Sequence, residues 1–101
     1  MTHRLHRGDI PAGVDFGAVV AIDTEAMGLN PHRDRLCVVQ LSAGDGDAHL
    51  VQFPPSAYAA PRLTRLLADP GVTKLFHLAR FDLAMIYHYL GVPETPRWRN
   101  W

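Results

Sequence analysis

The sequence has little cysteine, no excess of charge of either sign and no long apolar run. Its 101 residues include a single cysteine, Cys37, so an intramolecular disulfide is excluded and Cys37 is expected to be buried within a strand. Ten basic residues balance ten acidic ones, so no overall positive field indicates a nucleic-acid partner. No segment approaches the roughly 20 apolar residues of a membrane span, and residues 1–9 lack the apolar stretch of a signal peptide. We therefore expect a soluble, cytoplasmic protein.

Two acidic residues close the apolar run 19–22. Asp23 and Glu25 are two positions apart, and side chains at i and i+2 of a strand point to the same face. Adjacent carboxylates repel each other unless a cation such as Mg²⁺ or Mn²⁺ lies between them. The alternative is that Asp23 begins a turn and Glu25 is a solvated loop residue. Turn residues and a second apolar run, 36–41, follow directly, which indicates a hairpin whose mouth carries the acids and favours a metal site.

A third acid, Asp82, occupies an unusual position. On a helix that begins near Ala79, its neighbours one turn away are all apolar: Leu78, Met85 and Ile86. An ionised carboxylate on such a stripe is costly without a partner. The helix macrodipole favours an acid in the first turn by roughly 0.3–1 kcal/mol, which is one explanation. A metal ion shared with Asp23 accounts for more of the pattern.

These acids belong to three segments that together resemble a known family. Segment 23–29 is similar to the first motif of the DEDD 3′-5′ exonucleases, which have the RNase H-like fold. Segment 35–41 is similar to the second strand of ribonuclease D, and segment 77–82 to the second exonuclease motif. The segments occur in the expected order between residue 19 and about residue 90. The chain therefore resembles ribonuclease D over most of its length.

The resemblance implies hydrolysis of single-stranded RNA 3′ ends to nucleoside monophosphates by two divalent ions, Mg²⁺ or Mn²⁺, about 3.5–4 Å apart. Asp23 would bridge both ions, Glu25 would bind the ion that activates water, and Asp82 would hold the second ion. The segment that contacts the terminal nucleotide would comprise Met27, Gly28 and Leu29, although turn formation and core packing would also explain these residues. Further candidate substrate-binding residues come from the second motif: His77, Arg80 and Phe81.

The chain also departs from the family pattern. Leu78 stands where relatives commonly have Asn, and Ala26 stands where ribonuclease D often has an aromatic residue. The third motif, with a Tyr or His general base four residues before a fourth metal-binding Asp, has no counterpart up to Trp101. We therefore expect residues 1–96 to form part of a 3′-5′ exonuclease domain and residues 97–101 to form an atypical tail. The chain after Pro93 is expected to be mobile, and hydrolysis to be impaired.

Two other functions remain open. Segment 23–29 also fits a proofreading-type DNA 3′-5′ exonuclease, although segment 35–41 favours ribonuclease D. The second alternative is a non-catalytic remnant that binds nucleic acid or metal weakly and needs a partner chain. Self-association or such a partner would cover the apolar surface of a partial domain. A phosphate backbone could be contacted by four basic residues, although a solvated surface charge is the more common role for any one of them: Arg33, Arg35, Lys74 and Arg80.

The apolar and turn patterns predict an α/β fold with an RNase H-like mixed sheet, in which an antiparallel meander is followed by β-α-β-α. Strands are expected near residues 4–6, 19–24, 36–42, 48–52 and 72–76. Helices are expected near residues 60–68 and 79–90, with Gly91 ending the second helix.

Overall fold

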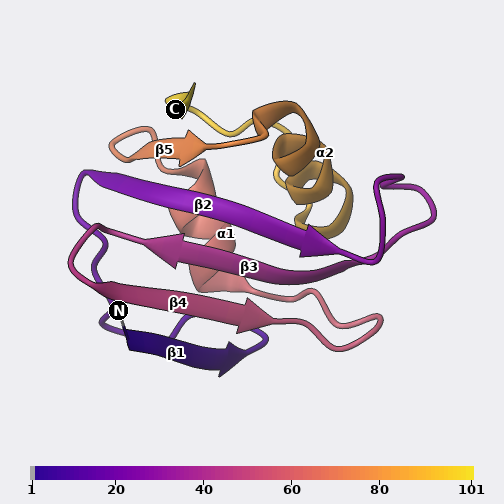
Figure 1. Ribbon diagram of the computed structural model, residues 1–101, viewed down its shortest axis with the longest axis horizontal. Helices are drawn as coiled ribbons and strands as arrows, with labels where there is room; N and C mark the ends of the chain where they lie inside the picture. Colours follow the sequence, from indigo (N-terminus) through magenta and orange to yellow (C-terminus); the bar gives the residue numbers. More distant parts are fainter. Residues whose placement is uncertain (1) are drawn as a thin grey trace.

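The structure, a computed structural model, describes residues 2–101 and consists of one six-stranded sheet with two helices (Figure 1). The elements along the chain are β1 (Thr2–Arg7), β2 (Val19–Ala26), β3 (Leu36–Ser42), β4 (Asp47–Gln52), α1 (Pro61–Ala68), β5 (Thr73–Phe76), α2 (Ala79–Leu90) and β6 (Trp98–Asn100). This arrangement confirms the predicted α/β fold. Neither α1 nor α2, the helices of the described residues, has the length and apolar character needed to cross a bilayer.

The strand order is β1-β4-β3-β2-β5-β6. Strands β2, β3 and β4 form the predicted antiparallel meander. Strand β1 pairs in parallel with β4, so it is not part of that meander. Strand β5 follows α1 and pairs in parallel with β2, and β6 pairs in parallel with β5. Because β2, β5 and β6 are parallel, their carboxyl ends meet at one edge of the sheet.

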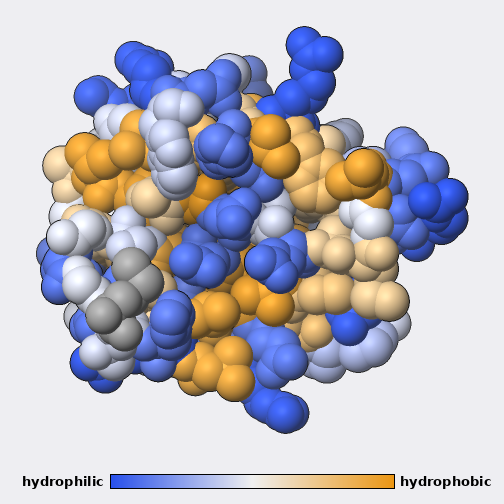
Figure 2. All heavy atoms as spheres, viewed as in Figure 1, coloured by the Kyte–Doolittle hydropathy of each residue, from blue (hydrophilic) through white to orange (hydrophobic). Residues whose placement is uncertain are grey.

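The sheet has a covered face and an open face. Along β2, Val20, Ile22 and Thr24 are buried, whereas Asp23 and Glu25 are exposed, so the prediction that both acids point to one face is confirmed. Helix α1 lies behind the sheet in Figure 1. The helices contribute six buried apolar side chains to the core: Leu63, Leu67, Ala79, Met85, Ile86 and Leu90. On the open side, polar and apolar side chains are interspersed (Figure 2).

The two helices begin and end by different means. Helix α2 ends as predicted at Gly91, which has a φ of 70° and donates its N–H to Tyr87 O at 3.2 Å. This left-handed conformation favours glycine. Helix α1 has no capping side chain of its own. Instead, the distant Asp9 carboxylate accepts the N–H groups of Arg62 at 2.9 Å and Leu63 at 2.8 Å. Asp9 thus joins the segment after β1 to the start of α1.

Three expectations from the sequence were wrong. Residues 98–100 are not a mobile tail, because they extend the sheet as β6. Lys74 is not available to a phosphate, because its side chain is fully buried and its Nζ donates to the carbonyl oxygens of Asp69 at 2.5 Å and Pro96 at 2.8 Å. Holding Pro96 in this way brings the following residues alongside β5. Cys37 is half-buried rather than buried.

Candidate active site

All three predicted acids line one depression of about 350 Å³ at the carboxyl end of β2. Asp23 and Glu25 reach it from the open face and are exposed to solvent. Asp82 reaches it from the first turn of α2 and is only 1% exposed. The depression therefore lies where a strand end meets a helix start, and it receives carboxylates from both elements.

Thr24 is the residue that links these two elements, and the sequence analysis missed it. Its Oγ1 donates to Asp82 Oδ1 at 2.5 Å, and both side chains are buried. Burial raises the pKa of the Asp82 carboxyl; the hydrogen bond from Thr24 opposes this shift, and the negative charge of Asp23 adds to it. A signal for Thr24 was present in the sequence. Side chains alternate between the two faces of a strand, and this polar residue occupies a position of β2 whose side chain points to the buried face.

Among residues 2–101, nothing forms a hydrogen bond with Asp82 Oδ2, which is buried. Buried polar atoms in proteins are normally paired, so an orphaned carboxylate oxygen indicates a missing cation or donor. Oxygen ligands of this kind suit Mg²⁺ and Mn²⁺, and the residues present therefore fit a divalent ion. Within residues 2–101, however, no three His, Cys, Asp or Glu side chains are close enough to form a ready-made metal site. The acids share a depression without forming a closed cage.

The loop between β2 and β3 supplies an apolar rim. Met27 and Leu29 are 70% and 83% exposed, so core packing does not explain them. Gly28 and Leu29 line the depression, whereas Met27 does not. A Cβ at Gly28 would collide with the carboxylate of Asp34, so this position needs the absence of a side chain. The loop therefore presents large apolar side chains to solvent beside the acids.

The Asp34 carboxylate is held firmly within this loop. It accepts hydrogen bonds from the Arg33 side chain at 2.9 Å and from the Asn30 N–H at 3.0 Å. The hydrogen bond from Arg33, followed by that from Asn30, lowers the pKa of Asp34 to about 2. The loop is also attached to α2, because Tyr89 donates its hydroxyl to Pro31 O at 2.9 Å. Hydrogen bonds to Asp34 within the loop and to Pro31 from α2 therefore hold the rim in place.

The second-motif residues separate into two groups. Phe81, together with Leu78, lines the depression. His77 and Arg80 are exposed but do not line it. Of the predicted phosphate ligands, Arg33 is occupied by Asp34, and Arg35 is half-buried and donates to Phe53 O at 3.0 Å. Within residues 2–101, the Arg80 side chain makes no hydrogen bond or ion pair, which leaves it able to contact a ligand.

Comparison with known proteins gives the family. Residues 10–99 match the family described as 3′-5′ exonuclease. The chain belongs to the 3′-5′ exonuclease family. Ribonuclease D of Granulibacter bethesdensis is 44% identical over 77 residues, which are 76% of this chain and 19% of that protein. This match confirms the resemblance to ribonuclease D.

Two solved structures are similar to nearly the whole of this chain. Brucella melitensis NrnC bound to pGG is 52% identical, with a TM-score of 0.87 over 95% of this chain and 47% of that chain. NrnC with bound Mg²⁺ is 49% identical, with a TM-score of 0.91 over 99% of this chain and 50% of that chain. The chain therefore spans about half the length of these structures and about one fifth of the curated ribonuclease D.

Proposed function

We propose that this chain forms part of a ribonuclease D-type 3′-5′ exonuclease, which hydrolyses RNA from the 3′ end with two divalent ions, Mg²⁺ or Mn²⁺. The observation that carries the proposal is the meeting of Asp23, Glu25 and Asp82 in one depression of an exonuclease-family chain. The Mg²⁺ bound to a relative 49% identical to this chain supports the choice of metal. The pGG bound to a relative 52% identical to this chain supports a nucleic-acid substrate.

In this proposal, the three acids hold the ions from two sides. Asp23 and Glu25, which lie on the open face, would hold the ions from the solvent side. Asp82, fixed by Thr24, would offer its unpartnered Oδ2 from the helix side. When bound, the ions would activate a water molecule and stabilise negative charge on the transferred phosphoryl group. The buried setting of Asp82 keeps its carboxylate from competing solvent donors.

The apolar rim would bind the terminal nucleotide. Met27, Leu29 and Leu78 are exposed large apolar side chains around the acids, with exposed fractions of 70%, 83% and 61%. Such side chains can pack against a base or sugar, and Gly28 would allow the backbone a close approach. Phe81 lines the same depression, while Arg80 and His77 lie beside it and could contact phosphates.

Hydrolysis under single-turnover conditions tests the proposal. The chain, in molar excess, is incubated with 5′-labelled single-stranded RNA, the matching DNA or pGG, in Mn²⁺ or Mg²⁺. Asp23→Asn and Asp82→Asn remove candidate ligands with little change in shape. Asp45→Asn is the matched control, because Asp45 is an exposed loop acid that does not line the depression. Binding of Mn²⁺ to each variant is measured in parallel.

The expected result is a ladder that shortens from the 3′ end, is lost in Asp23→Asn and Asp82→Asn, and persists in Asp45→Asn. A ladder that survives both ligand substitutions would contradict the assigned site. The site would also be contradicted if the folded, unsubstituted chain gave no ladder and bound Mn²⁺ no more tightly than the Asp23→Asn variant. Faster hydrolysis of DNA than of RNA would favour the proofreading-type alternative.

A further inference from the structure

The loop between β2 and β3, residues 27–35, holds its own internal shape. The Met27 N–H donates to Arg35 O at 2.9 Å, which joins the two ends of the loop. At the tip, Asn30 O accepts the N–H of Asp34 at 2.7 Å. The hydrogen bonds to the Asp34 carboxylate add to this internal set. These bonds leave open how the loop as a whole is inclined toward the acidic depression.

The strand that leads into this loop is irregular. The pairing of β2 with β3 shifts in register between Glu25 and Ala26, directly before the loop. An irregularity of this kind bends a strand and increases its local twist. The pairing of β2 with β3 therefore does not fix the direction of the loop, and contacts from outside the hairpin have to do so.

Helix α2 supplies such contacts. The Tyr89 hydroxyl donates to Pro31 O at 2.9 Å, and the ring centroids of His32 and His88 are 5.1 Å apart. Both histidines are exposed, whereas Tyr89 is half-buried and its ring centroid lies 5.1 Å from that of Tyr58. A hydrogen bond restricts distance and direction more tightly than contact between exposed rings does. The Tyr89 hydroxyl is thus the contact that locates the tip of the loop.

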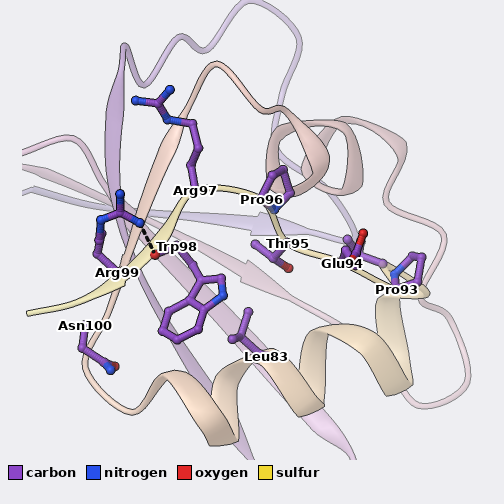
Figure 3. Close-up of a pocket in the computed structure, with 10 residues that line it drawn as sticks. Leu83, Pro93, Glu94, Thr95, Pro96, Arg97, Trp98, Arg99 and Asn100 are labelled. Carbon is purple, nitrogen blue, oxygen red and sulfur yellow. Dashed lines mark hydrogen bonds between the residues drawn. The ribbon is translucent and has the colours of Figure 1, made fainter.

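Helix α2 is also a fixed frame for this contact. Its apolar side is buried in the core, and Leu83 lines one pocket together with the Trp98 ring of β6 (Figure 3). Tyr89 follows Asp82 by seven residues. Seven residues are two helical turns, so both side chains project from the same side of α2, about 10 Å apart along its axis. One helix therefore holds Asp82 at the acidic depression and, through Tyr89, the loop that forms the rim.

A neighbouring tyrosine shows that a tyrosine on α2 does not need such a bond. Tyr87 is 61% exposed, and its hydroxyl makes no hydrogen bond within residues 2–101. The hydroxyl of Tyr89 instead reaches the carbonyl of Pro31, whose φ is fixed by its ring. Because this point of the backbone is stiff, restraining it restrains the direction of the loop on either side.

We infer that Tyr89 is a positioning residue for the acidic depression. By holding Pro31, its hydroxyl fixes the inclination of the loop. The rim residues Gly28 and Leu29 thereby keep a set distance from Phe81, which lines the depression from α2. That this distance decides how tightly a nucleotide is held rests on the proposed function, whereas the attachment of the loop does not.

Nuclear magnetic resonance of the chain in EDTA tests the attachment without metal or substrate. Tyr89→Phe removes the hydroxyl and keeps the ring. Tyr87→Phe is the matched control, because it makes the same change on the same helix at a hydroxyl without a hydrogen bond in residues 2–101. The readouts are the nuclear Overhauser effect between the rings of His32 and His88 and the backbone order parameters of residues 27–35.

Tyr89→Phe should remove the Overhauser effect between the two rings and lower the order parameters of the loop from about 0.85 to below about 0.6. The hydrogen-exchange protection of the Met27 and Asp34 amides should persist, because both donate within the loop. Tyr87→Phe should leave all of these quantities unchanged.

A binding measurement tests the effect on the depression. Mn²⁺ alone, and then GMP in the presence of Mn²⁺, are titrated calorimetrically into each variant. Tyr89→Phe should weaken GMP binding about fivefold, the usual effect of one hydrogen bond, and should leave the affinity for Mn²⁺ unchanged because the three acids do not move. A general loss of structure would weaken both, so the difference between the two affinities identifies positioning.

Two results would overturn the inference. One is a folded Tyr89→Phe variant that keeps the Overhauser effect and the loop order; the other is a variant that loses both and still binds GMP as tightly as the unsubstituted chain. Failure of the proposed function looks different. An unsubstituted chain that binds no GMP in Mn²⁺, although Tyr89→Phe frees the loop, would contradict the exonuclease and support the attachment. GMP binding that is lost in Asp23→Asn and intact in Tyr89→Phe would support the exonuclease site and contradict the inference.

Discussion

At the scale of single residues, the pair formed by Thr24 and Asp82 determines the character of the acidic depression. A hydroxyl on one strand position fixes the rotamer of a carboxylate on a helix, and only one of the two carboxylate oxygens is satisfied. Burial without full pairing favours the neutral carboxyl, whereas a bound cation would favour the charged form. In the proposed site, the same carboxylate would cost stability in the metal-free fold and would serve as a ligand when a metal ion binds.

Asp82→Asn is expected to stabilise the metal-free chain at pH 7. The pKa of Asp82 is raised in the folded state, chiefly by burial. Between the unfolded pKa, near 4, and this raised value, the folded chain binds more protons, so its stability falls as pH rises. Asparagine resembles the neutral carboxyl and avoids this loss. Thermal unfolding in EDTA should show a higher melting temperature for the variant at pH 7, with the difference shrinking as the pH falls toward 4.

The control for this prediction is Asp45→Asn, which removes an exposed acid and should show no such pH-dependent gain. Added Mn²⁺ should raise the melting temperature of the unsubstituted chain more than that of Asp82→Asn. A variant that melts at or below the temperature of the unsubstituted chain at pH 7, without metal, would contradict the role assigned to burial.

At the scale of secondary-structure elements, contacts between distant segments supply hydrogen bonds that the local sequence of an element does not provide. Helix α1 has eight residues and no capping side chain of its own, yet Asp9 accepts two of its first N–H groups. The loop after β2 is likewise attached to α2 through Tyr89 and Pro31. Strand β6 depends on Lys74, which holds Pro96 near β5.

Asp9→Ala is expected to lower the free energy of unfolding by about 1 kcal/mol, within the range of roughly 0.5–2 kcal/mol for loss of a helix cap. The reason is that two amide groups at the start of α1 lose their acceptor. Chemical denaturation monitored by circular dichroism measures the change. Asp9→Asn keeps one acceptor oxygen and should lose less.

Asp15→Ala provides the matched comparison for Asp9. Asp15 also accepts a backbone N–H, but from Gly17 within its own exposed loop. Its substitution should change the free energy of unfolding by less than that of Asp9. An equal loss for both variants would mean that Asp9 acts only on its own loop and does not cap α1.

At the scale of the whole molecule, the open sheet face and the acidic depression belong to a chain that shares its fold with about half of each matched NrnC chain. The family's third motif, as the resemblance defines it, has no match within these 101 residues. The proposed site therefore has three candidate metal-binding acids, and the resemblance offers no candidate general base among these residues. A general base typically contributes about 10²–10⁴-fold to a hydrolytic rate.

A polypeptide of these 101 residues is accordingly expected to hydrolyse RNA about 10²–10⁴-fold more slowly than the ribonuclease D of Granulibacter bethesdensis under identical single-turnover conditions. Side-by-side rates with the same labelled RNA and Mn²⁺ measure the ratio. A rate within a few-fold of that ribonuclease D would contradict this expectation, and would mean that residues within the 101 supply the missing functions or that these functions are dispensable.

Much of the fold could be predicted from local patterns. Short apolar runs predicted β2 and β3, the turn residues between them indicated a hairpin, and Gly91 marked the end of α2. The two acids of β2 were assigned to one face because strand geometry leaves no other choice. Asp82 was predicted to be a metal ligand because it interrupts the apolar stripe of a helix. That interruption is also visible in the local sequence.

The partners of these residues could not be predicted in the same way. Lys74 was expected at the surface because lysine is usually exposed, and its burial depends on two carbonyl groups from other segments. Thr24 was passed over because its partner is on a helix far along the chain. Residues 98–100 carry too weak a strand pattern to identify without the neighbouring β5.

The sequence by itself determined the order of the elements, the family and the identity of the three acids, because these depend on residue type and short-range spacing. Only the tertiary structure decided that Asp82 is held by Thr24, that Asp9 caps α1 and that Tyr89 holds the loop at Pro31. Each of these contacts joins residues from different elements, and their energy depends on burial and distance, which exist only once the chain has folded.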